Sequence, residues 1–445
     1  MNDAMRFSTQ PSQSWKENPL MLKTRREFVM STLGIAGVGA LGFRNLNLEG
    51  ATTSKNEPGV LFEGIAIAPR SGVQESVLKR LEDRRYWLLF GEKSHLVKKS
   101  SNDHGRTWSQ TVAVKQTDGS AIRLAHDTPH LSILHLKSGR LGMVHGGPIS
   151  RPGRDGTVLF RTSDDNGKTW SKETAIDPIF AVCRTQAARV LSTGRIIVPV
   201  MKWISPYTGG NSEDESNNLC YSWVYYSDDE GQTWQRSLSE LLVFLDRGRR
   251  GYTHFEETVV EELSDGTLLM FGRTELGRPY QSISDDQGIS WTTPKPVQLA
   301  SSYAPSTLMR IPSTKDLLVA WNQTSTEEML TGLNRHRLST AISKDEGKTW
   351  THFRNLESLD DRVRIEPPRG EPEVYRMEKY AYLQPADRAR YPHAPGCVRV
   401  CYPTIAIAKD EVTFAYDYGL GTGELAKQHA TKVKIVSMDW LYGRV

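Results

Sequence analysis

The sequence contains five copies of one short motif, and their spacing limits the possible fold more than any other feature. The third copy, residues 227–234, shows the pattern S-x-D-x-G-x-[ST]-W in full. The copies, called boxes below, end at five tryptophans: Trp108, Trp170, Trp234, Trp291 and Trp350. Successive tryptophans lie 62, 64, 57 and 59 residues apart. A repeat of about sixty residues predicts an array of similar supersecondary units.

The residue types of a box suit a tight turn between two β-strands. The carboxylate of Asp229 accepts backbone N–H groups of such a turn, and Gly231 adopts the left-handed backbone conformation without strain. The hydroxyls of Ser227 and Thr233 satisfy further polar groups, while Trp234 offers a large apolar face. We therefore interpret each box as a structural hairpin that carries no chemistry.

A second, weaker repeat accompanies the boxes and completes the fold prediction. Six short polar turns separate pairs of apolar strands, at residues 82–85, 137–140, 192–195, 264–267, 313–316 and 409–411. Two hairpins per unit give four antiparallel strands, which is the content of a propeller blade. The sixth unit has no box, and residues 60–68 are expected to supply its missing strand. The sequence thus predicts an all-β fold, a six-bladed β-propeller over residues 56–445.

Residues 1–55 are expected to lie outside the propeller. Arg25 and Arg26 precede a short apolar run, residues 28–41, which is rich in glycine and alanine. This arrangement resembles a bacterial twin-arginine export signal followed by a linker. About fifteen weakly apolar residues are few for a bilayer span. We expect a periplasmic or extracellular protein, and both cleavage of the signal and its retention as a membrane tether remain open.

Composition restricts the partners and cofactors. The formal net charge of +4 on 445 residues argues against nucleic acid as a partner. The four cysteines show no C-x-x-C spacing and no histidine pair at ligand spacing, so neither a metal site nor any other cofactor is expected. We expect buried free thiols at Cys183, Cys220, Cys397 and Cys401.

Chain direction sorts the polar residues between the two ends of the propeller. If the first strand of each blade runs away from one end, its start and the end of the second strand lie at that end, called the mouth below. The boxes then lie at the opposite end. The expected first-strand starts are Gln74 with Glu75, His130 preceded by Asp127, Thr185 beside Arg184, Glu257, Ser306 and Tyr402. The expected second-strand ends are Glu92, His145, Lys202, Arg273, Asn322 and Asp417, and a third strand starts near Arg335.

With these positions in place, the sequence resembles the sialidase, or BNR-repeat, superfamily over about residues 60–440. The resemblance rests on the five boxes and on four segments: residues 256–291, 304–322, 334–350 and 401–416. It implies that Tyr402 is a nucleophile paired with Glu257, and that Arg273 and Arg335 bind the carboxylate of a sugar. Because an anionic sugar repels a carboxylate nucleophile, a phenol activated by a base suits this chemistry.

The neighbours of these residues leave alternatives open. Glu256 competes with Glu257, since a slip of one residue reverses which carboxylate faces the axis. Arg337 similarly competes with Arg335.

The sequence departs from the superfamily pattern at two places. The first carboxylate-binding arginine is absent, because the matching stretch begins Gln74-Glu75; Arg70 is a candidate substitute. The aspartate that serves as general acid is also absent from residues 92–99. Asp127 is our candidate acid, with Glu92 and His95 as alternatives, and we expect His130 and Glu92 to bind substrate.

Three functions fit these observations. The first is an exported retaining glycoside hydrolase of the sialidase type that releases a terminal, acidic sugar such as sialic acid from a glycoconjugate. The second is a propeller that binds glycans or proteins without catalysis. The third is a polysaccharide lyase in which Tyr402 acts with His126 or His130.

Overall fold

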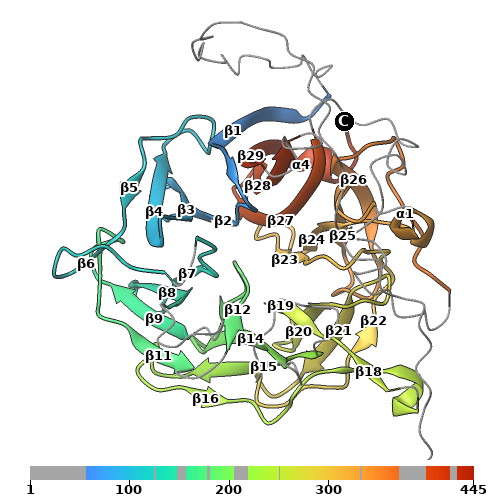
Figure 1. The fold of residues 1–445 in the computed structure, drawn as a ribbon, viewed down its shortest axis with the longest axis horizontal. Helices are drawn as coiled ribbons and strands as arrows, with labels where there is room; N and C mark the ends of the chain where they lie inside the picture. Colours follow the sequence, from blue (N-terminus) through green and yellow to red (C-terminus); the bar gives the residue numbers. More distant parts are fainter. Residues whose placement is uncertain are drawn as a thin grey trace, which may run out of the picture. The chain divides into compact units, whose positions relative to one another are not determined.

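The structure is a computed structural model that describes residues 57–124, 127–147, 157–177, 181–204, 219–249, 251–330, 333–369, 397–420 and 428–445. The predicted export signal and His126 lie outside these residues. Six antiparallel sheets are arranged in a ring, with the chain passing from one sheet to the next in order (Figure 1). The predicted six-bladed β-propeller is therefore confirmed.

Each of the first three blades is built from strands in chain order, with the first strand innermost (Figure 1), although β10 in blade 2 belongs to a separate pair. Blade 1 contains β2 (Ser76–Arg80), β3 (Tyr86–Glu92), β4 (His95–Ser101) and β5 (Val112–Ala113). Blade 2 contains β7 (Ser132–His135), β8 (Leu141–Gly146), β9 (Val158–Ser163) and β11 (Thr174–Asp177). In blade 3 the first strand is split into two short pieces: β12 (Val182–Cys183) and β13 (Arg189–Val190) precede β14 (Ile196–Ile204), β15 (Leu219–Ser227) and β16 (Gln235–Arg236).

The remaining blades follow the same order. Blade 4 contains β19 (Glu256–Glu262), β20 (Leu268–Arg273), β21 (Tyr280–Ser284) and β22 (Lys295–Pro296). Blade 5 contains β23 (Thr307–Arg310), β24 (Leu317–Asn322), β25 (Leu338–Ser343) and β26 (Thr351–Glu357). Blade 6 contains β27 (Cys397–Ile407), β28 (Glu411–Leu420), β29 (Gln428–Ser437) and β1 (Val60–Ser71).

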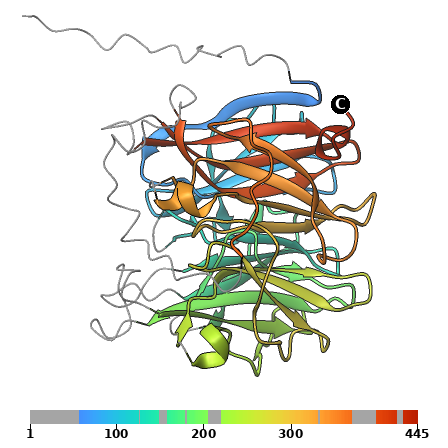
Figure 2. The same cartoon turned by 90° about the vertical axis from the view of Figure 1, so that its right-hand side faces the viewer.

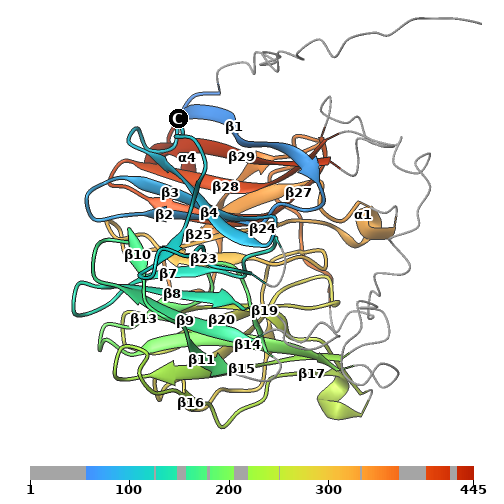
Figure 3. The same cartoon turned by 60° about the vertical axis from the view of Figure 1, so that its left-hand side comes forward.

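The ring closes where the two ends of the propeller chain meet. Strand β1 pairs antiparallel with β29, with Val60 opposite Val436, and so completes the sixth blade (Figure 3). This pairing confirms the expectation that residues near 60–68 supply the missing strand. It also covers the open edge of β29, which would otherwise be available for pairing with another chain.

Short elements connect the blades. The two-stranded pairs are β6 (Lys115–Gln116) with β10 (Thr169–Trp170), and β17 (Val243–Phe244) with β18 (Tyr252–Thr253). The helical turns are η1 (Leu245–Gly248), α1 (Thr326–Leu330) and α4 (Met438–Leu441). Both η1 and α1 lie on the same face of the propeller (Figure 2). In the part of the chain that the structure describes, no helix is long and apolar enough to cross a membrane.

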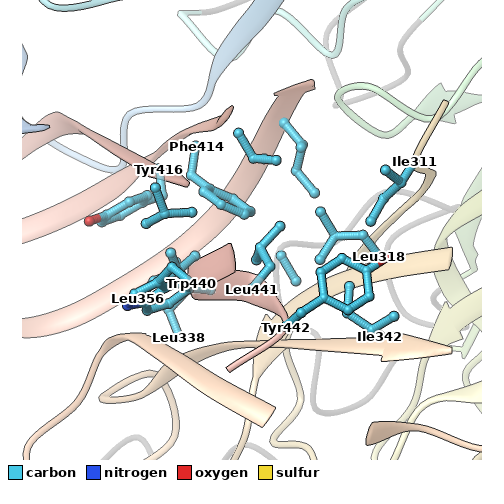
Figure 4. Packing of buried hydrophobic residues seen from close by; sticks show 14 of the residues in the cluster. Ile311, Leu318, Leu338, Ile342, Leu356, Phe414, Tyr416, Trp440, Leu441 and Tyr442 are labelled. Atoms are coloured by element: carbon cyan, nitrogen blue, oxygen red, sulfur yellow. The ribbon is translucent and has the colours of Figure 1, made fainter. Parts of the chain in front are cut away.

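Apolar side chains fill the space between neighbouring blades. One cluster joins blades 5 and 6, where Trp440 and Leu441 of α4 pack against Phe414 and Leu338 (Figure 4). All four side chains are buried. Burial of such side chains on both faces of each sheet supplies the main stabilisation of the ring.

The boxes form the predicted turns. In the third box, the carboxylate of Asp229 accepts the backbone N–H of Thr233 at 2.9 Å and the hydroxyl of Ser227 at 2.8 Å. Gly231 has a φ of +88°, and a Cβ at this position would lie 2.1 Å from the ring of Phe160. Both the backbone conformation and the close packing therefore require glycine.

The boxes lie at the end opposite the first-strand starts. The first hairpin turn of blade 2 contacts the box of blade 3, since the N–H and hydroxyl of Ser138 donate to Glu230, each at 2.7 Å. The turn of blade 4 contacts the box of blade 5 in the same way, through Ser264 and Glu346 at 2.7 Å. First-strand turns and boxes therefore share one end, and the first-strand starts occupy the mouth.

The side chain of Gln186 connects first strands of three blades between the two ends of the propeller. The side chain of Gln186 in blade 3 accepts the N–H of Ile405 in blade 6 at 2.8 Å and donates to the carbonyl of Leu78 in blade 1 at 3.2 Å. Below it, at the box end, the first strands surround a cavity of about 470 Å³ that Lys79 and Arg189 help to line. Gln186 itself is one of the residues that line this cavity.

Candidate active site

The first-strand starts of non-adjacent blades contact one another at the mouth. The hydroxyl of Thr185 in blade 3 donates to Oε2 of Glu75 in blade 1 at 2.8 Å. Nη2 of Arg184 donates to Oγ1 of Thr307 in blade 5 at 3.1 Å. Because these contacts cross the ring, the charged groups beside them gather around one centre.

Glu257 lies at this centre and is held by an unusual backbone. It is the second residue of β19 and has a φ of +45°, at a break in the register between β19 and β20. Nη1 of Arg273 donates to its Oε2 at 2.5 Å, and the residue is only 7% exposed. Burial alone would raise the pKa of Glu257, but the charges of Arg273, Arg184 and Arg335 outweigh it and hold this pKa below its usual value.

The neighbouring Glu256 has a different environment. Its side chain is fully buried, accepts a hydrogen bond from the hydroxyl of Tyr303 and lies 3.5 Å from Nε of Arg273. Arg273 therefore bridges both carboxylates, and its guanidinium carbon lies 3.5 Å from the centroid of the Tyr303 ring. Glu257 is the carboxylate of this pair whose negative charge raises the pKa of Tyr402.

Tyr402 lies in β27 at a second site of backbone strain. It is half-buried and has a φ of +54°, where the register between β27 and β28 shifts. A positive φ is rare for a bulky residue and is concentrated at functional sites. Burial and the negative charge of Glu257 raise the pKa of Tyr402 well above its usual value, although Arg335 acts in the opposite direction. The phenol is therefore neutral at neutral pH.

Arg335 and Arg337 differ in their partners. The guanidinium carbon of Arg335 lies 5.2 Å from the centroid of the Tyr402 ring. Its hydrogen bonds, to Sγ of Cys401 and the carbonyl of Tyr303, are each 3.5 Å long and therefore weak. Arg337 instead forms ion pairs with Glu328 at 2.9 Å and Asp360 at 2.7 Å. The geometry favours Arg335 over Arg337 as the arginine that faces the phenol.

The other expected mouth residues lie on the rim or take part in structural contacts. Asp127 is exposed, and its Oδ1 accepts the N–H of Ser94 in the β3–β4 hairpin at 2.7 Å. Glu92 is also exposed and pairs in register with His95 across that hairpin. His130 is half-buried with a φ of +44°, and its carbonyl accepts the thiol of Cys183 at 2.9 Å. None of these hydrogen bonds joins Asp127, Glu92 or His130 to Tyr402 or Glu257.

Arg70 does not take the place of the missing arginine. Its Nη1 donates to the carbonyl of Gly91 at 2.7 Å, and its guanidinium stacks over Phe90 at 5.7 Å from the ring centroid. His95 is also engaged locally, with Nδ1 located 2.8 Å from the carbonyl of Lys93.

Two second-strand ends are internally satisfied rather than available for a ligand. Nε2 of His145 accepts Nε–H of Arg161 at 3.0 Å, and the buried ring pairs with the carbonyl of Gly146 through Nδ1. Burial and the charge of Arg161 lower the pKa of His145 to about 4. Asp417 is buried as well, pairing with His429 at 2.8 Å and accepting the N–H of Gln74 at 2.7 Å.

Sequence reasoning placed Glu75 and Arg184 at the mouth but assigned them no role. Both side chains are buried, and both interact electrostatically with Glu257. Burial and the charge of Glu257 raise the pKa of Glu75 to about 7, although Thr185 and Arg184 act against them. Their positions at first-strand starts were a usable signal, because every such start in the ring was already predicted to reach the same centre.

Among the described residues, no cluster of three histidine, cysteine or acidic side chains could hold a metal ion. Cys183, Cys220 and Cys401 are buried free thiols, and the side chain of Cys397 lies outside the described part of the chain. The site therefore offers a neutral phenol, an ionised carboxylate and several guanidinium groups.

Comparison with curated proteins identifies relatives of low similarity. The chain is 26% identical over 221 residues to a sialidase of Clostridium perfringens, which covers 44% of this chain and 52% of that protein. It is 25% identical over 301 residues to a sialidase of Paraclostridium sordellii, which covers 60% of this chain and 68% of that protein. The match thus spans about half the length of the first relative and about two thirds of the second.

Solved structures share the fold. A protein of unknown function from Dyadobacter fermentans aligns with a TM-score of 0.56 at 16% identity, covering 86% of this chain and 100% of that chain. Trypanosoma rangeli sialidase, in a complex with 2,3-difluorosialic acid described as a covalent intermediate, aligns with a TM-score of 0.50 at 14% identity. That match covers 83% of this chain and 55% of the other. At such identities the likeness shows the fold alone.

A family model described as a BNR repeat-like domain matches residues 150–414, more than half of the chain. The match includes four of the five boxes as well as Glu257, Arg273, Arg335 and Tyr402. The chain therefore belongs to the family of BNR repeat-like proteins.

Proposed function

We propose that this protein is a retaining glycoside hydrolase of the sialidase type that releases a terminal acidic sugar through a tyrosyl intermediate. The observation that carries this proposal is the electrostatic interaction of Tyr402 with Glu257, two residues that both have a positive φ at the mouth. Arginines hold the pKa of Glu257 low, whereas burial beside Glu257 holds the pKa of Tyr402 high. Neighbouring groups with opposite shifts supply a base and a protonated nucleophile at the same pH.

In the first step, Glu257 accepts the phenolic proton while the oxygen of Tyr402 attacks the anomeric carbon. The bond to the leaving oxygen breaks, and that oxygen takes a proton from a general acid, for which Asp127 on the rim is our candidate. In the second step, Asp127 takes a proton from water as the water attacks the anomeric carbon. The bond from that carbon to Tyr402 breaks and Glu257 returns its proton to the phenolic oxygen, so that two inversions give net retention. Arg335, whose own hydrogen bonds are long, binds the sugar carboxylate beside the phenol.

Hydrolysis of a panel of aryl glycosides, including sialosides and uronides, tests the proposal. We expect Tyr402→Phe to reduce turnover at least about 1,000-fold while the fold is retained, because only the nucleophilic oxygen is lost. Tyr416→Phe is a matched control. Tyr416 lies in the neighbouring strand β28, and its hydroxyl donates to Glu357 of β26 at 2.5 Å. An unaltered rate in Tyr402→Phe would contradict the tyrosyl mechanism.

A second candidate, a glycan-binding propeller without catalysis, is favoured by the start of blade 1. Gln74 there is engaged in structural hydrogen bonds, because its side chain donates to the carbonyl of Ala68 at 3.2 Å and accepts the hydroxyl of Thr431 at 3.3 Å. Neither Gln74 nor Glu75 supplies the arginine that the superfamily resemblance implies. Binding of a sugar from the panel without cleavage of any aryl glycoside would favour this function.

We also propose that the protein is exported by the twin-arginine route, on the basis of Arg25 and Arg26 and the apolar run that follows them. Fractionation of expressing bacterial cells tests this separately from activity. Wild-type protein should reach the periplasm or medium, whereas a variant with both arginines changed to lysine should remain in the cytoplasm. Equal export of the two proteins would contradict this route.

A further inference from the structure

Arg184 is anchored next to the proposed nucleophile. It follows β12 in the split first strand of blade 3 and is only 3% exposed. Its Nη2 donates to Oγ1 of Thr307, and the same hydroxyl donates to the carbonyl of Pro403, the residue after Tyr402. One hydroxyl group thus connects the Arg184 guanidinium to the strained segment that holds the phenol.

Most of the donors of Arg184 have no protein acceptor. Among the described residues, neither Nε nor Nη1 of Arg184 has a hydrogen-bond partner, and no ion pair is recorded for this side chain. Buried charged donors without acceptors are unfavourable and are rare unless something outside the protein satisfies them. Arg273 is different, because it is paired with Glu257 and Glu256 at the same centre.

The position of Arg184 coincides with the region where the superfamily's first arginine is missing. The adjacent residue, Thr185, donates its hydroxyl to Glu75 at the start of blade 1. Arg184 therefore approaches from blade 3 the place that blade 1 leaves without a basic group. Its charge acts on Glu257, Glu75 and Tyr402. Together with Arg273 and Arg335, it is the third guanidinium that acts on Glu257.

We propose that Arg184 binds the carboxylate of the sugar substrate and so determines the preference of the site for an acidic sugar. This inference rests on the proposed function, because it assigns a substrate-binding role at the same site. The Nε and Nη1 groups of Arg184 have no protein acceptor, so their N–H groups can donate charge-assisted hydrogen bonds to a carboxylate. Arg335, with its two weak contacts, supplies further donors.

Glu75 gives this binding a pH dependence. Its carboxyl faces Thr185 and interacts with Glu257 of β19, Asp417 of β28 and Arg184. When ionised, Glu75 attracts Arg184 and repels an incoming carboxylate; when protonated, it does neither. Its pKa of about 7 places this change near neutral pH. Anion binding should therefore be stronger on the acid side of this value.

Calorimetric titration of the full chain tests the inference without requiring turnover. The probes are free N-acetylneuraminic acid and its methyl ester, measured at about pH 6 and about pH 8, on either side of the Glu75 transition. We expect wild-type protein to prefer the acid over the ester, and more so at the lower pH. Arg184→Met should weaken binding of the acid roughly 10- to 100-fold, the loss expected for a charge-assisted hydrogen bond.

Two further variants distinguish a loss of carboxylate binding from a loss of folding. Arg184→Lys keeps the charge without the planar fork and should weaken acid binding less than Arg184→Met. Arg161→Met removes another buried arginine, which is paired with Glu173 at 2.5 Å in blade 2, and should leave both affinities unchanged. The preference of the wild-type protein for the acid over the ester, and the change of this preference with pH, are measured without any substitution.

Equal binding of the acid to wild-type and Arg184→Met protein would overturn the inference, as would wild-type protein that binds the acid no more tightly than the ester. Failure of the proposed function has a different signature. Wild-type protein that binds the acid through Arg184 but cleaves no glycoside of the panel would remove the hydrolase activity and leave this binding role intact.

Discussion

The two ends of strand β19 carry the same pair of residue types in contrasting surroundings. At the box end, Oε2 of Glu261 accepts Nε of Arg189 at 3.0 Å. The other donors of Arg189 reach the carbonyls of Gln186, Ala188 and Leu308 at 2.7–3.0 Å. At the mouth, Glu257 pairs with Arg273 in a strained backbone, beside Tyr402 and the unpaired donors of Arg184.

Within this one strand, the residues at the box end contribute to stability and those at the mouth contribute to function. The Glu261–Arg189 pair is complete, and the contacts of Arg189 with Glu261 and Leu308 join the first strands of blades 3, 4 and 5. The mouth instead keeps buried charge and positive φ angles, both of which cost stability. Proteins retain such features where a ligand or a reaction uses them. The boxes differ from the mouth in the same way, because a box such as that of Asp229 satisfies its polar groups internally.

Substitution of Glu257 at the mouth and of Glu261 at the box end should give the largest difference in activity between the two ends of β19. We expect Glu257→Gln to lower kcat/KM roughly 10²- to 10⁴-fold, because the amide cannot accept the phenolic proton. Glu261→Gln should leave kcat/KM unchanged while lowering the unfolding temperature, since it weakens a half-buried ion pair that touches no reacting group. Steady-state kinetics and thermal unfolding of both variants measure this. Equal losses of activity would contradict the assignment of roles.

Glu75→Gln should stabilise the folded protein at high pH, because it removes a buried carboxylate from the mouth. Because burial raises the pKa of Glu75 from 4.5 to about 7, the folded state binds more protons than the unfolded state between these values. Stability from this group therefore falls as the pH rises through that window, by a total on the order of 3 kcal/mol above it. The amide keeps an acceptor for Thr185 but carries no charge.

The variant should thus be more stable than wild type at about pH 8 and similar to it near pH 4.5, in urea unfolding experiments. A stability difference that does not change with pH, or that grows on acidification, would contradict this account of Glu75.

A box substitution should have a smaller effect that is confined to stability. Asp229→Ala removes the acceptor for the N–H of Thr233 and the hydroxyls of Thr233 and Ser227, so we expect a loss of about 2 kcal/mol. The adjacent Asp228 is exposed and forms an ion pair with Arg195 at 2.7 Å. Asp228→Ala should cost less than about 1 kcal/mol. A fall in kcat/KM in either variant would show that the boxes also support the site.

The fold was largely predictable from sequence because its determinants are local and repeated. The box pattern specifies a turn through residues a few positions apart, such as Asp229 and Thr233, and the period of the tryptophans gives the number of units. Pairing of β1 with β29 followed from a unit that lacked one strand. The short helix α1 gave no comparable signal, since five residues are too few for a helical pattern.

The site was predictable in part, because its contacts cross the ring. Counting along the strands located Glu257, Tyr402 and Arg273 at one end, where the structure also finds them. The choice between Glu257 and Glu256 depends on a positive φ that residue types do not indicate. The partners of Arg184 and Glu75 lie in blades far apart in sequence, so neither burial nor missing acceptors could be inferred beforehand.

The central claim, that Tyr402 is the nucleophile, is tested most directly by trapping the intermediate. The protein would be incubated with 2,3-difluorosialic acid, the compound in the covalent complex of Trypanosoma rangeli sialidase, then digested and analysed by mass spectrometry. We predict that the peptide containing Tyr402 gains the mass of one fluorinated sugar and that Tyr402→Phe protein gains none. A label on a peptide that lacks Tyr402, or no label on protein that hydrolyses sialosides, would contradict the account.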